Sequence, residues 1–159
     1  MNELRFFNRQ KTRAIAMPLL KRVTLRFLEQ AVPVDGYELG IHLVAAPEMA
    51  RLNEQYLQHE GSTDVITFNY REGKKNTGPV LGEIFICVDD ALKQAKEFKT
   101  TWQSEVVRYV VHGVLHLLGY DDLRPDLRRT MKREENRYVN SLSREFDLGT
   151  LQADGKKRK

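Results

Sequence analysis

An apolar segment at residues 106–118 constrains the fold of this chain more than any other part of it. Its apolar residues lie almost all round a helix, which predicts a central helix covered by other elements on most of its sides. Two histidines, His112 and His116, interrupt the segment four residues apart and therefore project from one face of that helix. Buried imidazoles need polar partners, so this pair needs one that both rings can reach.

A metal ion is a partner that the two rings can share. Gly119 predicts the end of the helix, because glycine readily adopts the left-handed conformation that stops a helix. Asp122 follows six residues after His116, where a chain that folds back returns a third donor. The spacing His-x3-His-x5-Asp is typical of a three-ligand zinc site with a fourth position open to water, and open zinc sites are catalytic. The alternative is that Asp122 merely opens the next helix and that the histidines are ordinary core or surface residues.

Composition favours one small domain and fits a polyanionic partner. The chain has 159 residues, which is long enough for one domain with a hydrophobic core. Its 26 Lys and Arg against 22 Asp and Glu give a formal net charge of +4, and basic residues crowd residues 5–26 and 156–159. Such clusters suit RNA, although runs of charge are commonly solvated surface. No signal peptide or membrane span is recognisable, which predicts a cytoplasmic protein with no membrane partner.

Hydrophobic periodicity predicts the remaining elements. Strands are expected near residues 4–6, 39–43, 65–68 and 81–88, and helices near 16–31, 47–58, 89–99 and onward from residue 125. Together with the histidine helix they predict a single α+β domain, with a mixed sheet of about four strands packed by about five helices. This metallohydrolase-like domain is expected to cover residues 1–149, followed by a basic, disordered tail at residues 150–159.

Within these elements, the sequence also predicts the exposure of one histidine and the residue that caps one helix. His42 alternates with Ile41 and Leu43, so it is expected on the solvent side of its strand and not as a metal ligand. Asp89 or Asp90 is expected to cap the helix at residues 89–99.

Residues 112–121 read H-G-V-L-H-L-L-G-Y-D and resemble the motif H-G-x-L-H-L-x-G-Y-D-H of the YbeY family of metal-dependent endoribonucleases. Blocks at residues 52–56, 63–68 and 81–84 are also similar, as are Met131 and Glu135 in the final helix. The resemblance implies a small α+β fold, a zinc ion held by three histidines and cleavage of single-stranded RNA. It also implies the small ribosomal subunit as a partner, with roles in ribosomal RNA maturation and ribosome quality control.

The third metal position differs from the family pattern, because Asp122 stands where the family has a histidine. Two histidines and a carboxylate still form recognised catalytic zinc sites, one ion per site, although this donor set also suits non-haem iron. Asp121 matches the family's own aspartate and is a candidate either to orient a histidine from behind or to cap the turn.

A second difference concerns the phosphate. Leu57 stands where the family has an arginine that lines the catalytic cleft, and the natural task of that arginine is to bind the scissile phosphate. The other candidates for RNA or phosphate contacts are His59, Arg51 and Arg71, and the sequence does not choose among them.

The leading interpretation is a metal-dependent endoribonuclease with no catalytic group beyond a metal-bound water. That water either attacks the phosphodiester itself or serves as base or acid while the 2′-hydroxyl of the RNA attacks, and the sequence does not decide between the two. Gly113 stands beside His112 where the H-E-x-x-H metalloproteases have their catalytic glutamate, which argues against peptide cleavage. Two alternatives remain: an RNA- or ribosome-binding factor that has lost catalysis, and a metal-dependent hydrolase of another substrate.

Overall fold

The computed structural model describes residues 2–32, 36–57, 63–71 and 78–153, and these form one mixed four-stranded sheet with helices. The strands are β1 (Asn2–Asn8), β2 (Tyr37–Val44), β3 (Val65–Asn69) and β4 (Val80–Cys87), in the order β1-β2-β4-β3. Neighbouring strands are parallel except for β3, which is antiparallel to β4. The predicted α+β class and the strand expected near residues 4–6 are confirmed, and this strand, β1, lies at one edge of the sheet.

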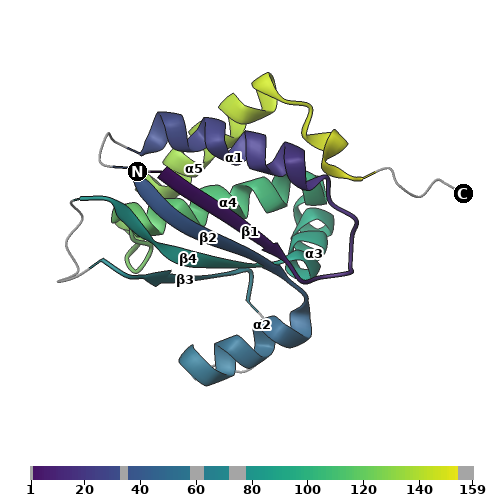
Figure 1. Cartoon of the computed structure of the whole chain (residues 1–159), viewed down its shortest axis with the longest axis horizontal. Helices are drawn as coiled ribbons and strands as arrows, with labels where there is room; N and C mark the ends of the chain where they lie inside the picture. Colours follow the sequence, from purple (N-terminus) through teal and green to yellow (C-terminus); the bar gives the residue numbers. More distant parts are fainter. Residues whose placement is uncertain (1, 33–35, 58–62, 72–77, 154–159) are drawn as a thin grey trace, which may run out of the picture.

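The described residues form five α-helices, which are α1 (Met17–Ala31), α2 (Ala46–Leu52), α3 (Val88–Phe98), α4 (Trp102–Leu118) and α5 (Pro125–Glu145). Helices α1, α4 and α5 lie on one side of the sheet, whereas α2 extends away from it at the bottom of the view (Figure 1). The main core lies between the sheet and the first group. The helix expected at residues 47–58 has two parts. Helix α2 ends at Leu52, and the chain continues as a π-helix at Asn53–Leu57.

Helix α4 is the central helix that the apolar segment predicts. The side chain of Thr101 accepts a hydrogen bond from the Ser104 amide at its start, and Gly119 ends it with a left-handed φ of 112°. Gly113 brings α4 close to the sheet, since a Cβ added there would lie 2.7 Å from a methyl carbon of Ile84. The contact holds the histidine-bearing end of α4 against β4.

On the opposite side of the sheet, His42 is buried, which contradicts the expectation that it faces solvent. Phe7 and Phe85 are its register partners on β1 and β4, and their rings stack on the imidazole at centroid distances of 4.7 and 4.1 Å. The His42 ring nitrogens lie 3.0 Å from Arg9 Nη1 and 2.5 Å from Glu83 Oε1. The prediction of exposure was wrong because the covering rings come from neighbouring strands.

Two other details differ from the sequence-based expectations. Helix α3 begins one residue earlier than expected and has no side-chain cap; Asp89 instead accepts hydrogen bonds from Thr12 Oγ1 and the Ala46 amide. The expected domain boundary at residue 149 falls inside a 3-10 helix at Leu148–Leu151, and Leu151 is buried. Residues 154–159 of the expected tail lie outside the described residues.

Candidate metal centre

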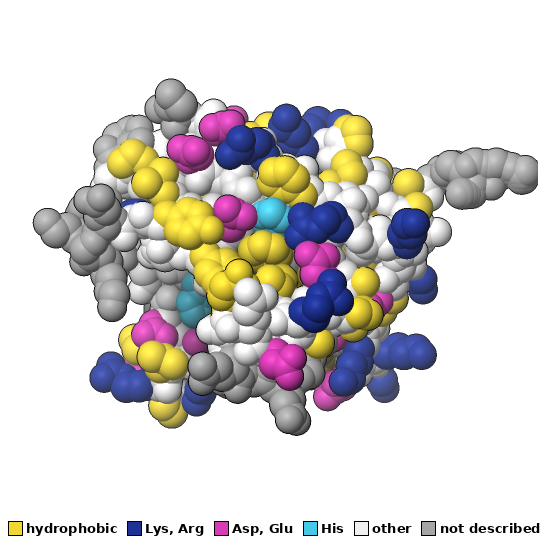
Figure 2. Space-filling model, turned by 60° about the horizontal axis from the view of Figure 1, so that its bottom comes forward, with side chains coloured by type: hydrophobic (Ala, Val, Ile, Leu, Met, Phe, Trp, Pro, Cys, Tyr) yellow, Lys and Arg dark blue, Asp and Glu magenta, His cyan; other side chains and the backbone are white. Residues whose placement is uncertain are grey.

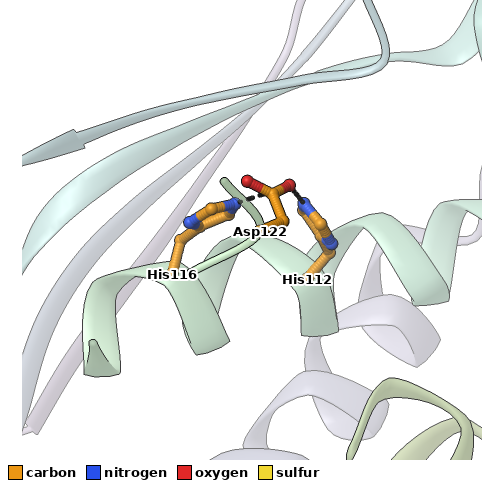
Figure 3. Close-up of side chains that lie close together, drawn as sticks. All are labelled: His112, His116 and Asp122. Carbon is orange, nitrogen blue, oxygen red and sulfur yellow. Dashed lines mark ion pairs between the residues drawn. The ribbon is translucent and has the colours of Figure 1, made fainter. Parts of the chain in front are cut away.

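Three donor groups converge at the end of α4. His112 and His116 lie one turn apart on α4, and Asp122 lies in the connection from α4 to α5. Figure 3 shows one nitrogen of each imidazole turned toward the Asp122 carboxylate. The Nε2 atom of His116 lies 3.5 Å from Asp122 Oδ2, and that of His112 lies 3.8 Å from the same oxygen. The glycine stop at Gly119 thus returns the chain to the histidines, as the spacing predicts.

The donor set fits a divalent metal ion. One ligand atom from each residue lies within 4.8 Å of the other two. Ligand atoms bound tetrahedrally to zinc at about 2.0–2.1 Å lie about 3.3–3.4 Å apart, so small movements bring these donors to bonding distance. The side chains of His112, His116 and Asp122 are 25%, 27% and 38% exposed, which leaves room for water or substrate on the outer side.

Glu135 fixes the orientation of His112 from behind. Its buried carboxylate on α5 bonds to Nδ1 of His112, while its other oxygen accepts a hydrogen bond from Arg108 at 3.0 Å. The Nδ1 proton directs the Nε2 lone pair toward Asp122, and such carboxylate–histidine pairs are typical behind metal ligands. Sequence reasoning assigned Glu135 no role, although a glutamate in the apolar stripe with Met131 and Leu142 was a usable signal.

Asp121 takes the second of its two expected roles. Its Oδ1 accepts a hydrogen bond from the amide of Leu123 at 3.1 Å, so it caps the turn after α4. The orienting contact to a histidine comes from Glu135 instead.

Burial and charge act in opposite directions on these groups. Burial lowers the pKa of His112, but the hydrogen bond and negative charge of Glu135 outweigh it and raise that pKa. Burial and the neighbouring His112 both lower the pKa of His116. Burial favours the neutral form of Glu135, yet its bonds to His112 and Arg108 lower its pKa. The Glu135 carboxylate is thereby held in the ionised form that orients His112.

The structure describes two of the three candidates for phosphate contacts, Arg71 and Arg51. Arg71 is buried and donates a hydrogen bond to the carbonyl of Leu117 at the last turn of α4, where a cation also suits the helix dipole. Arg51 lies on α2 and His59 lies outside the described residues. Leu57 is exposed at the end of the π-helix.

A hollow of about 270 Å³ adjoins His112 and is lined by cations that sequence reasoning missed, namely Arg108 and Lys132. The described lining of the hollow therefore mixes an apolar side chain, Phe98, with charged ones. Figure 2 shows one face of the molecule, on which hydrophobic, acidic and basic side chains also lie side by side.

The fold and the donor set describe a small α+β protein with a candidate hydrolytic metal centre. A family model described as endoribonuclease YbeY matches residues 5–143. The chain belongs to the YbeY family of endoribonucleases, and enzymes of this kind cleave RNA.

Individual relatives agree with this assignment. An endoribonuclease YbeY of Salinibacter ruber is 36% identical over 128 residues, which cover 75% of this chain and 82% of that protein. One of Syntrophotalea carbinolica is 37% identical over 140 residues, or 84% of this chain and 92% of that protein. The solution structure of a Thermotoga maritima protein matches with a TM-score of 0.65 and 26% identity, over 98% of this chain and 99% of that one.

Within the described residues, no helix combines the length and the apolar character needed to cross a membrane.

Proposed function

We propose that this protein is a metal-dependent endoribonuclease that cleaves single-stranded RNA, with one zinc ion as its metal. The observation that carries the proposal is the convergence of His112, His116 and Asp122, in a chain of an endoribonuclease family. The proposed substrate is ribosomal RNA of the small subunit in the cytoplasm, with roles in its maturation and in ribosome quality control. The site residues and the metal are part of this proposal.

Each side chain at the candidate centre has its own proposed role. His112, His116 and Asp122 would hold the ion, and Glu135 keeps the proton of His112 on Nδ1. Bound zinc acidifies a water and polarises a phosphoryl oxygen, which is the chemistry that phosphodiester hydrolysis needs. Asp122 adds a negative charge that a neutral histidine would not, so we expect weaker acidification than with three imidazoles. Arg108 balances the charge of Glu135.

A binding role without catalysis is the second candidate, and Leu57 is the observation that favours it. Leucine supplies no charge to a transition state, and Arg71 is buried against α4. Loss of one such stabilising contact commonly costs about 3–4 kcal/mol of transition-state stabilisation. A protein of this kind would bind RNA with strong salt dependence and would not cut it.

Cleavage of a labelled single-stranded RNA separates the two functions. The wild type with zinc is expected to cut the RNA, whereas a chelator, His116→Ala or Asp122→Asn is expected to abolish cutting. Binding of the same RNA by His116→Ala shows that the variant is folded and still recognises its substrate. Cleavage that survives both the chelator and His116→Ala would contradict the metal-dependent mechanism, and salt-sensitive binding without any cleavage supports the binding role.

A further inference from the structure

The hollow beside His112 has that residue in its described lining, but neither His116 nor Asp122. It lies between α3, α4 and α5, and its volume is about 270 Å³. Besides His112, its lining includes Asp64, Phe98, Glu105, Tyr109, Lys132 and Asn136. Pockets for whole small-molecule ligands measure about 300–1,000 Å³, so this hollow suits one small group.

Tyr109 contributes a buried hydroxyl that lacks a protein partner. The residue is 4% exposed, and its hydroxyl makes no hydrogen bond within the part of the chain that the structure describes. Burial and nearby carboxylates, those of Asp64 and Glu105, raise the pKa of Tyr109, so the hydroxyl keeps its proton and remains a donor. An unpaired buried hydroxyl is costly, and a ligand acceptor in the hollow would satisfy it.

The charges of the lining argue against a phosphate in the hollow. Asp64 and Glu105 line it, and Arg108 is already paired with Glu135 at 3.0 Å and with Asn136 at 2.8 Å. A doubly charged anion would therefore meet two carboxylates, and Lys132 is the one described cation of the lining that is not paired with Glu135. Hydroxyl, amide and carboxylate groups together offer both donors and acceptors, as the polar edge of a nucleobase requires.

Phe98 adds a surface for the flat side of such a base. It ends α3 at the rim of the hollow and is 62% exposed, although it is a large apolar side chain. Exposed aromatic rings beside polar groups are what single-stranded nucleic acids use for stacking.

We propose that this hollow is a nucleobase subsite, which holds one base of single-stranded RNA with its face on Phe98 and its edge at Tyr109. The subsite rests on the proposed function, since it places the adjoining phosphodiester at the His112–His116–Asp122 centre. It assigns to Phe98 and Tyr109 a binding role and to Lys132 a place at the side of the bound strand.

An abasic walk tests the subsite without relying on cleavage. Fluorescence anisotropy measures the binding of 2′-O-methyl RNA oligonucleotides, in the presence of a chelator, with one base removed at each position in turn. Removal at one position is expected to weaken binding to the wild type by about 5- to 10-fold, the lower range for loss of base stacking. Phe98→Ala is expected to weaken binding of the intact strand equally and to make that position insensitive to base removal.

Two conservative variants separate binding from folding. Phe98→Tyr keeps the ring and is expected to bind like the wild type, whereas Tyr109→Phe is expected to weaken binding about 2- to 10-fold with unchanged thermal stability. Tyr37→Phe is the matched control, because Tyr37 is also buried and does not line this hollow.

Each outcome bears separately on the subsite and on catalysis. Equal binding of all abasic strands, no RNA binding at all, or wild-type binding by Phe98→Ala and Tyr109→Phe overturns the subsite. RNA cleavage together with any of these results leaves the nuclease intact. Base-dependent binding at one position without cleavage under any metal condition supports the subsite and contradicts the nuclease.

Discussion

At the residue scale, the candidate centre is supported by the carboxylate of Glu135, which is not one of the three candidate ligands. Glu135 sits behind His112 and bonds to it, and Arg108 holds the other oxygen. Removing such a contact leaves the ligands in place but loosens the ring and lowers its basicity.

Glu135→Gln is expected to weaken zinc binding by about 10- to 100-fold, since the amide loses the negative charge that supports His112. Competition with a fluorescent chelator measures the affinity. Glu134→Gln is the matched control, because the neighbouring Glu134 pairs with Arg137 instead. Equal zinc affinity for Glu135→Gln and the wild type would show that Glu135 has only a packing role.

The His42 cluster predicts a pH dependence of stability. Arg9 can only donate, so Nδ1 of His42 is an acceptor and the ring is neutral with its proton on the nitrogen facing Glu83. Burial lowers the pKa of His42 below its ordinary value of 6.5, against the opposing effect of Glu83. A group with a lowered folded-state pKa stabilises the fold above its unfolded-state pKa, and this stability is lost as the pH falls.

We therefore expect the free energy of unfolding to fall more for the wild type than for His42→Gln when the pH is lowered from 7 to 5. The glutamine does not titrate but can still bond to Arg9 and Glu83. Urea denaturation across this range measures the difference. Parallel pH curves for the two proteins would contradict a neutral, buried His42.

The spacing predicted the convergence of the three candidate donors but not their surroundings, for a physical reason. His112, His116 and Asp122 lie within eleven residues, where helical periodicity and one glycine stop determine the geometry. The burial of His42 depends on three strands in register, which no local pattern encodes. The burial of Arg71 depends in the same way on a helix end distant in the chain.

At the scale of elements, the packing of α4 on β4 sets the height of the histidines above the sheet. Gly113 and Gly82 both stand at this contact, since a Cβ on Gly82 would lie 2.5 Å from the carbonyl oxygen of Phe68 and 3.0 Å from Leu117. Periodicity predicted both elements correctly. It did not predict how closely they approach, because closeness depends on the facing side chain.

Gly113→Ala is expected to destabilise the protein by about 1–2 kcal/mol, because overpacking against Ile84 outweighs the better helix propensity of alanine. Chemical denaturation measures the loss. Gly149→Ala is the control, where the nearest atom would lie 3.3 Å from the added Cβ, and we expect a change within about 0.5 kcal/mol. Wild-type stability of Gly113→Ala would mean that α4 can move away from the sheet freely.

At the scale of the whole molecule, the proposed metal site would couple metal binding to folding, because the three candidate ligands come together only in the folded chain. An ion that binds the folded state at 100 times its dissociation constant adds about 2.7 kcal/mol of stability. For a chain of this size, that corresponds to a rise in Tm of about 5–10 °C.

Zinc is therefore expected to raise the Tm of the wild type by this amount and a chelator to reverse the rise. Asp122→Asn should lose most of the shift, because an amide is a poor zinc ligand. Asp121→Asn should keep it, since an amide oxygen can still cap the turn at Leu123. Differential scanning calorimetry distinguishes them, and equal shifts in both variants would remove Asp122 from the ligand set.

Residues 148–153 determine when the main core can close during synthesis of the protein. The Ala16 amide bonds to the carbonyl of Leu151, and the Ala153 amide bonds to that of Ala14, so the segment before α1 is held by the end of the chain. Leu148 and Leu151 also belong to the main core. A nascent chain on the ribosome therefore lacks the residues that close this core until residues 148–153 have been translated. We expect this core to close only after residues 148–153 have left the exit tunnel.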